Sequence, residues 1–449
     1  MQSTTKKFGL DTIGEKITGF FAETVEAVAR ETKFVQRRSA LNGLNFLKVM
    51  VFGYLENPQA SLSDLAKVCL DLDVLITPQG LDERVNPFSV AFLKAMYIQA
   101  FEMFKNRTPL PLPVLKQFSA INLVDSSVKE LSDSMVEEYP GCGGNGAQAS
   151  LKIQLVFDFL CGNLKQITLQ AGRAADQAYR DYLAVVEQGS LTIADLGYFC
   201  LDALRAIAEK GAYFLIRYLY PTALLTPQGD RIDLRALLRS ETTKHIDQPV
   251  LLGCQPQHRI PCRLIALRLP QAVAEERRRK ASAHAAKRSK GETLSQDYLY
   301  LLGWTLFLTN ASTSLLSVAQ VTCLYRVRWQ IELIFKLWKS YCGLNAIGPW
   351  RKDCTWTEFY AKLMGIILVH FIIAPIRIPD DVWLGREISA VQVRKLLARF
   401  AVRLNLCLPD TTAFVDVLSQ LFDQIEQFGF KQKRRRKPNV CQLLASALA

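Results

Sequence analysis

The sequence predicts an α/β fold in which helical regions flank a central sheet. Residues 113 to 220 alternate apolar strand-like runs with helix-like runs, the pattern of an α/β layer arrangement. Residues 221 to 310 break into short β-like pieces, which predicts a β-rich insertion. Residues 1 to 112 and the chain after 310 show helical spacing of apolar residues. With 449 residues, 49% of them hydrophobic, the chain can bury a large core and form more than one domain.

The N-terminal region, residues 1 to 112, is predicted to be helical. Its stretch "SLSDLAKVCLDLDVLITPQGLDERV" (61 to 85) begins at a capping serine and contains two helical segments separated by a turn. This pattern resembles a helix-turn-helix, whose second helix would enter the major groove of DNA. A plain helical hairpin has the same spacing, so a DNA-binding role for this region is a hypothesis.

The first part of the predicted core, residues 113 to 220, contains two carboxylates at strand ends. The strand Ile121 to Val124 is followed by Asp125, and the strand in "SLTIADLGYFC" is followed by Asp195. Open α/β sheets bind ligands at the carboxyl ends of their strands, so both positions are candidates for a site.

Further elements complete this part of the core. We expect a hairpin from "LKIQLVFDF" and "LKQITLQAG", a helical stretch "AADQAYRDYLAVVEQ", the helix "LDALRAIAEK" and the strand "YFLIRYLY".

The insertion, residues 221 to 310, is predicted to contain the β-like pieces "RIDLRALL", "PVLLGC" and "CRLIALRLP" and a final strand "YLYLLGWTLFLTN". The basic run "RRRKASAHAAKRSKG" (277 to 291) is interpreted as a loop, either phosphate-contacting or disordered. Residues 311 to 345 are expected to supply the final core helix. Residues 346 to 449 form a helical region whose basic tail, "KQKRRRKP", is either solvated or grips phosphates.

The net charge of +13 and the isoelectric point of about 9.2 favour a polyanionic partner, either nucleic acid or an anionic membrane surface. The N-terminus lacks the apolar core of a secretory signal. The longest apolar run, "LMGIILVHFIIAPI" (363 to 376), is shorter than the roughly 20 residues that span a bilayer. We therefore expect a buried helix in a cytoplasmic protein without a membrane partner.

The cysteines and glycines do not indicate a zinc, disulfide or nucleotide site. The 11 cysteines are scattered without a C-x-x-C motif, and the only loose cluster is Cys254, His258 and Cys262. "GCGGNG" (141 to 146) fits G-x-G-x-x-G, but it precedes a predicted strand, whereas a dinucleotide fingerprint opens a helix.

The stretch "LYRVRWQIELIFKLWKS" (324 to 340) combines buried-type residues with one polar face. On a continuous helix Tyr325, Arg328, Glu332 and Lys339 fall at about 0°, 300°, 340° and 320°. The simplest interpretation is a solvated face with an Arg328 to Glu332 pair.

A second interpretation is a two-metal site formed by three carboxylates: Asp125, Asp195 and Glu332. Mg²⁺ takes oxygen ligands and needs few carboxylates when substrate phosphates supply the rest. Two such ions can activate an attacking oxygen and stabilise the leaving one in phosphodiester cleavage. Asp158 and Asp202 are rival carboxylates, but the first lies within a predicted strand and the second within a helix.

The cations beside Glu332 fit this second interpretation. Arg328 and Lys339 flank it on the same face and could hold the phosphates of the cut strand. Tyr325 could stack or donate to a phosphate.

The segment "YRVRWQIELIFKLWK" matches the Y-(2)-R-(3)-E-(6)-K signature of bacterial insertion-sequence transposases of the DDE type, the IS-four family. "LVDSS" and "IADLGYF" resemble the two aspartate motifs of that family, and the resemblance covers about residues 119 to 345. It implies an RNase H-like (retroviral-integrase-like) catalytic core in which Asp125, Asp195 and Glu332 bind two Mg²⁺ or Mn²⁺ ions.

The resemblance also implies a function and partners. The protein would bind double-stranded DNA at the terminal inverted repeats of its element, as a homodimer in the bacterial cytoplasm, associated with the nucleoid. It would cut the strands and join them to target DNA. Related enzymes form a DNA hairpin with a flipped base. Trp304 is the candidate for stacking on that base, with burial in the core as its alternative, whereas Trp329 is expected to pack. A catalytically inactive or domesticated DNA-binding descendant is the alternative function.

Overall fold

The described part of the chain falls into two structural units, each assembled from separated stretches of sequence. In the computed structural model the described residues are 8–106, 109, 115–143, 146–288, 294–348, 351–377 and 387–431. The first unit takes its residues from 1–111, 126–174 and 329–443, and the second takes its residues from 112–125 and 175–328. The basic tail from residue 432 onward lies outside the described residues.

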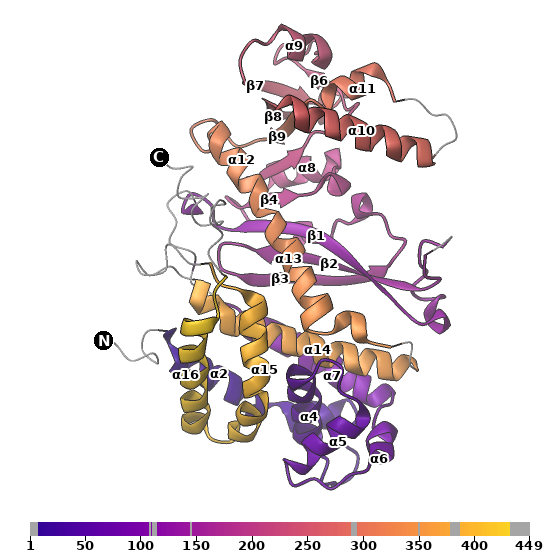
Figure 1. Cartoon of the computed structure of the whole chain (residues 1–449), viewed down its shortest axis with the longest axis vertical. Coiled ribbons are helices and arrows are strands. Elements are labelled where there is room, and N and C mark those ends of the chain that lie inside the picture. Colours follow the sequence, from indigo (N-terminus) through magenta and orange to yellow (C-terminus); the bar gives the residue numbers. More distant parts are fainter. Residues whose placement is uncertain are drawn as a thin grey trace. The chain divides into compact units, whose positions relative to one another are not determined.

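Helices from both ends of the chain build the first unit. The N-terminal ones are α2 (Leu10–Glu23), α3 (Val25–Glu31), α4 (Gly43–Glu56), α5 (Leu62–Leu70), α6 (Pro78–Glu83) and α7 (Pro87–Met103). The C-terminal ones are α14 (Lys352–Ile373), α15 (Ala390–Cys407) and α16 (Thr411–Phe428). α14 packs against α4 and α7, while α16 packs against α15 and α2 (Figure 1). Both predicted helical regions are confirmed within the described residues.

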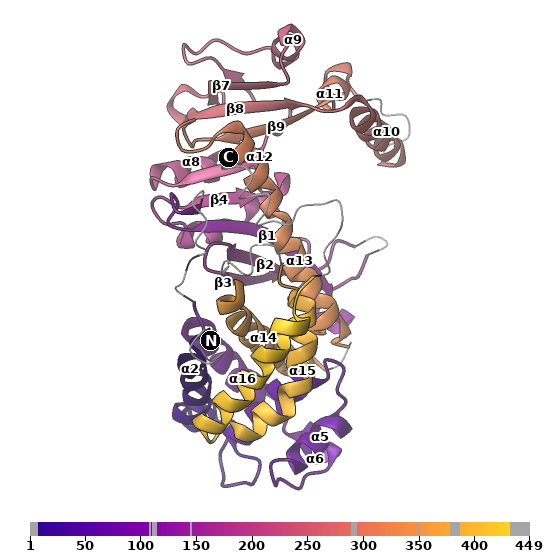
Figure 2. The same cartoon turned by 60° about the vertical axis from the view of Figure 1, so that its left-hand side comes forward.

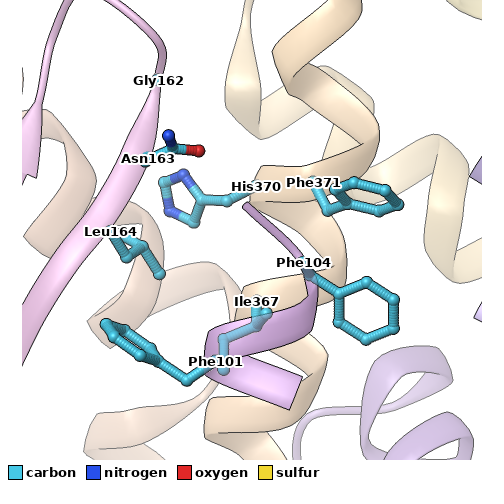
Figure 3. A pocket seen from close by; sticks show the side chains of 8 residues that line it. All are labelled: Phe101, Phe104, Gly162, Asn163, Leu164, Ile367, His370 and Phe371. Atoms are coloured by element: carbon cyan, nitrogen blue, oxygen red, sulfur yellow. The ribbon is translucent and has the colours of Figure 1, made fainter. Parts of the chain in front are cut away.

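The apolar run at 363 to 376 lies in α14, and the prediction of a buried helix is confirmed. Residues Lys352–Ile376 are long and apolar enough to cross a membrane, but 89% of their most apolar window is buried inside the protein. Aromatic residues of α7 and α14 line a small pocket together with His370 and Asn163 (Figure 3).

The predicted hairpin is present in the first unit. β2 (Ser150–Asp158) and β3 (Asn163–Ala171) pair antiparallel, with a bulge at Val156 and Phe157, and Gly162 adopts φ 79° in the turn. The glycine-rich stretch at 141 to 146 precedes β2 and opens no helix, although its residues 144 and 145 lie outside the described part.

The second unit contains a sheet ordered β1-β4-β5-β9-β8-β7-β6. Its strands are β1 (Ile121–Glu130, of which residues 121 to 125 belong here), β4 (Leu191–Ala194), β5 (Tyr213–Arg217), β6 (Leu224–Leu225), β7 (His245–Leu252), β8 (Ile260–Arg268) and β9 (Trp304–Thr309). The ladders from β1 to β5 are parallel and all the others are antiparallel. Figure 2 shows strands β7, β8 and β9 lying side by side.

Helices of the second unit pack beside this sheet. α8 (Leu201–Glu209) contacts β5 and β8, and α12 (Val318–Val327) contacts β5. The insertion adds α9 (Leu234–Ser240), α10 (Gln271–Arg288) and α11 (Gln296–Leu301).

Several local predictions are wrong. "RIDLRALL" forms α9, the basic run lies largely in α10, and "YLYLLG" forms α11 rather than the start of a strand. The helical stretch predicted after residue 174 consists of two 3₁₀ turns, Asp176–Ala178 and Asp181–Val185. Short runs rich in leucine or tyrosine fit strand and helix periods equally well, so their tertiary contacts decide between the two.

A buried arginine anchors the loop that leads into α12. Arg263 of β8 donates from Nη1 to the carbonyls of Ala311 and Leu316, at 2.9 Å each, and forms an ion pair with Asp247 of β7. Asn310 accepts from the backbone N–H of Phe214 at 2.8 Å, at the start of β5. These contacts fix where α12 begins on the sheet.

Candidate active site

The two predicted aspartates lie at the same level of neighbouring parallel strands. Val124 of β1 pairs with Ala194 of β4, so the next residues, Asp125 and Asp195, face each other across the two strands. Paired positions of parallel strands share one face of the sheet and lie about 4.8 Å apart. The residues that precede the aspartates are buried, so the sheet holds both carboxylates at the edge of the core.

Asp125 does not end its strand, contrary to the prediction. β1 continues to Glu130, but the parallel ladder with β4 stops at Val124. Asp125 is therefore the first residue beyond that ladder. Asp195 does end β4 as predicted and leads into the 3₁₀ turn Leu196–Tyr198.

A third residue at this level, Arg217, was not predicted from the sequence. Ile193 of β4 pairs with Leu215 of β5, and Asp195 and Arg217 each follow two residues later; both are close enough to Tyr325 to affect its pKa. The only signal in the sequence is a basic residue at the end of the run "YFLIR". A strand-end arginine is ordinary until the register of three strands is known.

Arg328 contacts the first aspartate. Its Nη1 lies 3.4 Å from Oδ2 of Asp125, and the two side chains are only 16% and 19% exposed. The guanidinium thus partly neutralises one carboxylate of the pair, in a region with little water to screen the interaction.

Tyr325, one turn before Arg328, lies over the same face of the sheet. Its ring packs on Phe307 of β9 with the ring centroids 4.9 Å apart, and Phe307 is the register partner of Arg217. Burial, and to a smaller extent Asp195, raise the pKa of Tyr325 to about 12, although Arg328 and Arg217 oppose the shift. The phenol is therefore protonated at neutral pH and can donate a hydrogen bond.

Glu332 and Lys339 belong to the first unit. α13 (Trp329–Lys336) carries Glu332 in its first turn, where a carboxylate interacts favourably with the helix dipole. Lys339 lies in a π-helical turn, Leu337–Tyr341, and burial lowers its pKa.

The prediction of one uninterrupted helix over 324 to 340 is wrong. The chain passes from α12 to α13 at Arg328, whose N–H bonds to the carbonyl of Tyr325 at i−3, and a π turn follows α13. Because a π turn contains more residues than an α turn, the angular position calculated for Lys339 does not hold.

Buried polar contacts hold the π turn. Trp338 is fully buried and donates from Nε1 to Nε2 of His370 at 3.0 Å. Figure 3 shows His370 at the wall of the small pocket beside Asn163. Just beyond the turn, Lys129 donates to the carbonyl of Ile347 at 2.9 Å, and Lys362 donates to that of Gly343 at 2.8 Å.

The structure does not bring Trp304 together with these residues. Trp304 is 5% exposed, and the guanidinium of Arg268 lies 4.8 Å from its ring centroid. Because side chains alternate along β9, Trp304 faces the opposite side of the sheet from Phe307. Trp329, which we expected to pack, is 56% exposed.

The rival carboxylates have local structural roles. Asp158 is 4% exposed and accepts from the N–H of Leu160 at 2.9 Å in the hairpin turn. Asp202 forms an exposed ion pair with Arg205 at 2.5 Å on α8.

The donor set of Asp125 and Asp195 fits a hard divalent cation, because both supply carboxylate oxygens at one edge of the sheet. Within the described ranges, no three His, Cys, Asp or Glu side chains form a metal cluster. That result also removes the loose group of Cys254, His258 and Cys262 as a zinc site. A cation at this edge would have to share Asp125 with the guanidinium of Arg328.

The helix pair predicted at 61 to 85 is present as α5 and α6. Ser61 and Asp64 form a capping box at the start of α5. α6 has only six residues, and its Asp82 forms an ion pair with Arg351 at 2.8 Å. Whether this pair reads DNA stays a prediction.

Comparisons with known proteins relate the chain to one family. The family model described as "Transposase DDE domain" matches residues 117–363. The chain is 25% identical to the transposase of insertion sequence element IS231F from Bacillus thuringiensis subsp. israelensis, over 94% of this chain and 92% of that protein. It is 26% identical to the transposase of IS1151 from Clostridium perfringens, over 95% and 94% of the two chains.

A solved structure of the piggyBac transposase synaptic complex with hairpin DNA is also similar. It is 10% identical, with a TM-score of 0.46, over 98% of this chain and 87% of the other. A TM-score this low does not establish that the two chains share a fold.

Proposed function

The chain belongs to the family of transposases with a DDE domain, and from this premise we propose how its residues bind and cut DNA. It is an insertion-sequence transposase, an enzyme that acts on DNA. The observation that carries the site assignment is that Asp125, Asp195 and Arg217 each lie just beyond the same end of the parallel ladders that join β1, β4 and β5.

The proposed catalytic core is RNase H-like. Two features of the second unit support this: parallel strands β1, β4 and β5 meet at an edge with acidic residues, and α12 returns over the same face. In the first unit, the β2–β3 hairpin adjoins the remaining residues of β1. The strands β6 to β8 and helices α9 to α11 are then an insertion between β5 and β9.

Asp125, Asp195 and Glu332 are the proposed ligands of two divalent ions, Mg²⁺ or Mn²⁺. Such ions, when bound, activate the attacking oxygen and stabilise the leaving oxygen of a phosphodiester. The sheet contributes by holding two of the carboxylates rigidly at adjacent positions, which preorganises them for the reaction.

The cations and the phenol at this edge are proposed to hold the DNA backbone. Arg217 and Arg328 present guanidinium groups, which match phosphate geometry in a bidentate manner. The protonated phenol of Tyr325 can donate to a phosphate oxygen. Lys339 is proposed as a further phosphate contact. Trp304 remains the proposed stacking residue for a flipped base, which would require Arg268 to leave its ring and the base to reach the face of β9 opposite Phe307.

The proposed partners are the two ends of the element and target DNA. We propose that a homodimer holds both terminal repeats, that residues 1 to 112 contribute to recognising them, and that the protein acts in the bacterial cytoplasm at the nucleoid. The positive net charge supports a DNA partner.

The test is cleavage of a labelled duplex carrying the DNA just outside the reading frame, with Mg²⁺, Mn²⁺ or EDTA, by wild type and Glu332→Gln. We expect metal-dependent cuts at a fixed boundary, abolished in the variant, which should still bind the duplex because its phosphate contacts remain. Wild-type cleavage by Glu332→Gln would remove Glu332 from the site. Binding without cutting by either protein would support the alternative, an inactive or domesticated DNA-binding descendant.

A further inference from the structure

Helix α10 is attached to the sheet face that carries the candidate site. Arg277 of α10 donates from Nη1 to Oγ1 of Thr305 at 3.3 Å and to the carbonyl of Trp304 at 3.4 Å. Thr305 lies two residues before Phe307, so both side chains emerge on the same face of β9. That face also carries Tyr325, which packs on Phe307.

Arg217 lies between Arg277 and the two aspartates. It pairs with Phe307, on the strand next to Asp195. The sheet order is β1, β4, β5, β9. Asp125 lies on β1, Asp195 follows β4, Arg217 ends β5, and β9 binds Arg277. Arg217 is also close enough to Arg277 to lower the pKa of its guanidinium, behind the larger effect of burial.

Beyond Arg277, α10 presents a basic stripe to solvent. Lys280, His284 and Lys287 follow one another at i, i+4 and i+7, within about 60° of each other around the helix. All three side chains are exposed, whereas Ala274 is buried. Lys280 pairs with Glu276 at 2.8 Å, but both members are exposed, and solvent and salt screen such a pair so that it contributes little to stability. A phosphate could therefore replace Glu276 as its partner.

The composition of α10 excludes an apolar partner for this stripe. The helix is polar around most of its circumference, and such a helix must find its stabilising contacts in solvent or in a charged partner. A membrane-bound helix needs bulky apolar residues opposite its basic face, and the residues between 280 and 287 are serine, alanine and histidine. Figure 2 shows α10 beside α11, next to the ends of β8 and β9.

We propose that Arg217, Arg277, Lys280 and Lys287 form a phosphate track that binds the DNA backbone and leads it from the cleavage site outward along α10. Arg277 to Lys287 spans about 15 Å along the helix axis. A DNA strand carries one phosphate per roughly 3.4 Å of axis, so this length is enough for several successive contacts. The proposal rests on the proposed function and names the surface that the DNA flanking the cut site occupies.

The test compares variants on two faces of α10. Lys280→Gln and Lys287→Gln each remove one charge from the track, and the double variant removes both. Arg279→Gln is the matched control, because Arg279 is exposed on the same helix but lies about 80° to 140° around it from the stripe. Circular dichroism checks that every variant keeps the helix content of wild type.

Binding to the end-carrying duplex is measured over a series of salt concentrations. Each lost phosphate contact should reduce the slope of log K against log salt by about 0.9, and the double variant should reduce it by about 1.8. Arg279→Gln should keep the wild-type slope. Equal slopes for the track variants and Arg279→Gln would overturn the proposal.

Phosphate ethylation interference locates the contacts on the DNA. In wild type, we expect a continuous run of sensitive phosphates that starts at the cut site. Lys287→Gln should lose the far end of this run and Arg279→Gln should keep it; retention of the whole run by Lys287→Gln would contradict the track. A wild-type protein that neither binds nor cuts the duplex would instead refute the proposed function, so the two failures are distinct.

Discussion

Asp195 and Arg217 lie beyond the same end of the parallel ladder between two neighbouring strands, each two residues after the last register pair, Ile193 and Leu215. The aspartate and the arginine thus place opposite charges at the edge of the sheet where a metal-bound phosphate, itself negatively charged, would bind. An aspartate alone would repel that phosphate, and the adjacent guanidinium offsets the repulsion.

Replacing Arg217 should slow cleavage. Arg217→Gln removes a charge-assisted hydrogen bond to phosphate, worth about 1.5 to 3 kcal/mol, which corresponds to a roughly 10- to 150-fold lower rate. Single-turnover cleavage of the labelled duplex measures this effect. Arg205→Gln is the control, because Arg205 pairs with Asp202 on the surface of α8. Similar rates for the two variants would show that Arg217 does not contact the substrate.

Replacing Arg328 should change the metal requirement. Arg328→Gln frees Asp125 of its guanidinium partner, so two neighbouring carboxylates attract a divalent ion more strongly. We expect half-maximal cleavage at a severalfold lower Mg²⁺ concentration, together with a lower maximal rate. A Mg²⁺ titration of cleavage measures both quantities. Arg326→Gln is the control, because Arg326 is an exposed neighbour of Arg328, and it should leave the midpoint of the Mg²⁺ titration unchanged. A midpoint shift of similar size in Arg326→Gln would indicate a general effect of lost positive charge.

Tyr325 should contribute through its protonated phenol over the whole working pH range. Because the pKa of Tyr325 is raised to about 12, the neutral form persists well above pH 9 and no ionisation of this group should appear between pH 7 and 9. Tyr325→Phe removes one neutral hydrogen bond, with an expected rate loss of about 3- to 10-fold. Rate profiles of wild type and variant against pH should be parallel. Profiles that converge at high pH would indicate that the phenol ionises in this range.

The contacts of Arg263 should stabilise the second unit strongly. Arg263→Met leaves Asp247 without its partner and two loop carbonyls without their donor, and breaking a buried pair in this way costs about 3 to 5 kcal/mol. A thermal unfolding scan should show a lower midpoint. Arg263→Met/Asp247→Leu should recover part of the loss, because the unpaired carboxylate is gone. A double variant no more stable than the single one would assign the stability to the loop carbonyls alone.

The order of strands and helices was largely predictable, because segments with a strong periodicity of apolar residues indicate their secondary structure directly. The strands around Asp125 and Asp195, the β2–β3 hairpin and the buried helix α14 were all recognised from apolar runs. The weaker segments failed for a common reason. α9 and α10 contain residues that suit several backbone conformations, and only their contacts with α11 and β9 decide the outcome.

The site residues could not all be predicted, because the sequence does not reveal the register of the strands that bring them together. Asp125 was recognisable as a polar residue after an apolar run, but the continuation of β1 to Glu130 depends on pairing with a different strand. Arg217 gains its place only when β1, β4 and β5 are aligned, since nothing local distinguishes it from a solvated strand end. The interruption at Arg328 and the π turn after α13 likewise depend on tertiary packing, including the contact between Trp338 and His370.

The packing of α2 against α16 has a consequence for how the protein is made. The hydroxyl groups of Thr18 and Thr411 meet at 2.9 Å across 393 residues of chain. A ribosome adding about 5 to 20 residues per second needs roughly 20 to 80 s to synthesise that interval. Through that time α2 can pack on α3 and α7, which are made early, but its face that carries Gly14 and Thr18 lacks α16 to cover it. Chains that terminate early should therefore aggregate or be degraded, and intact protein should accumulate only when synthesis is complete.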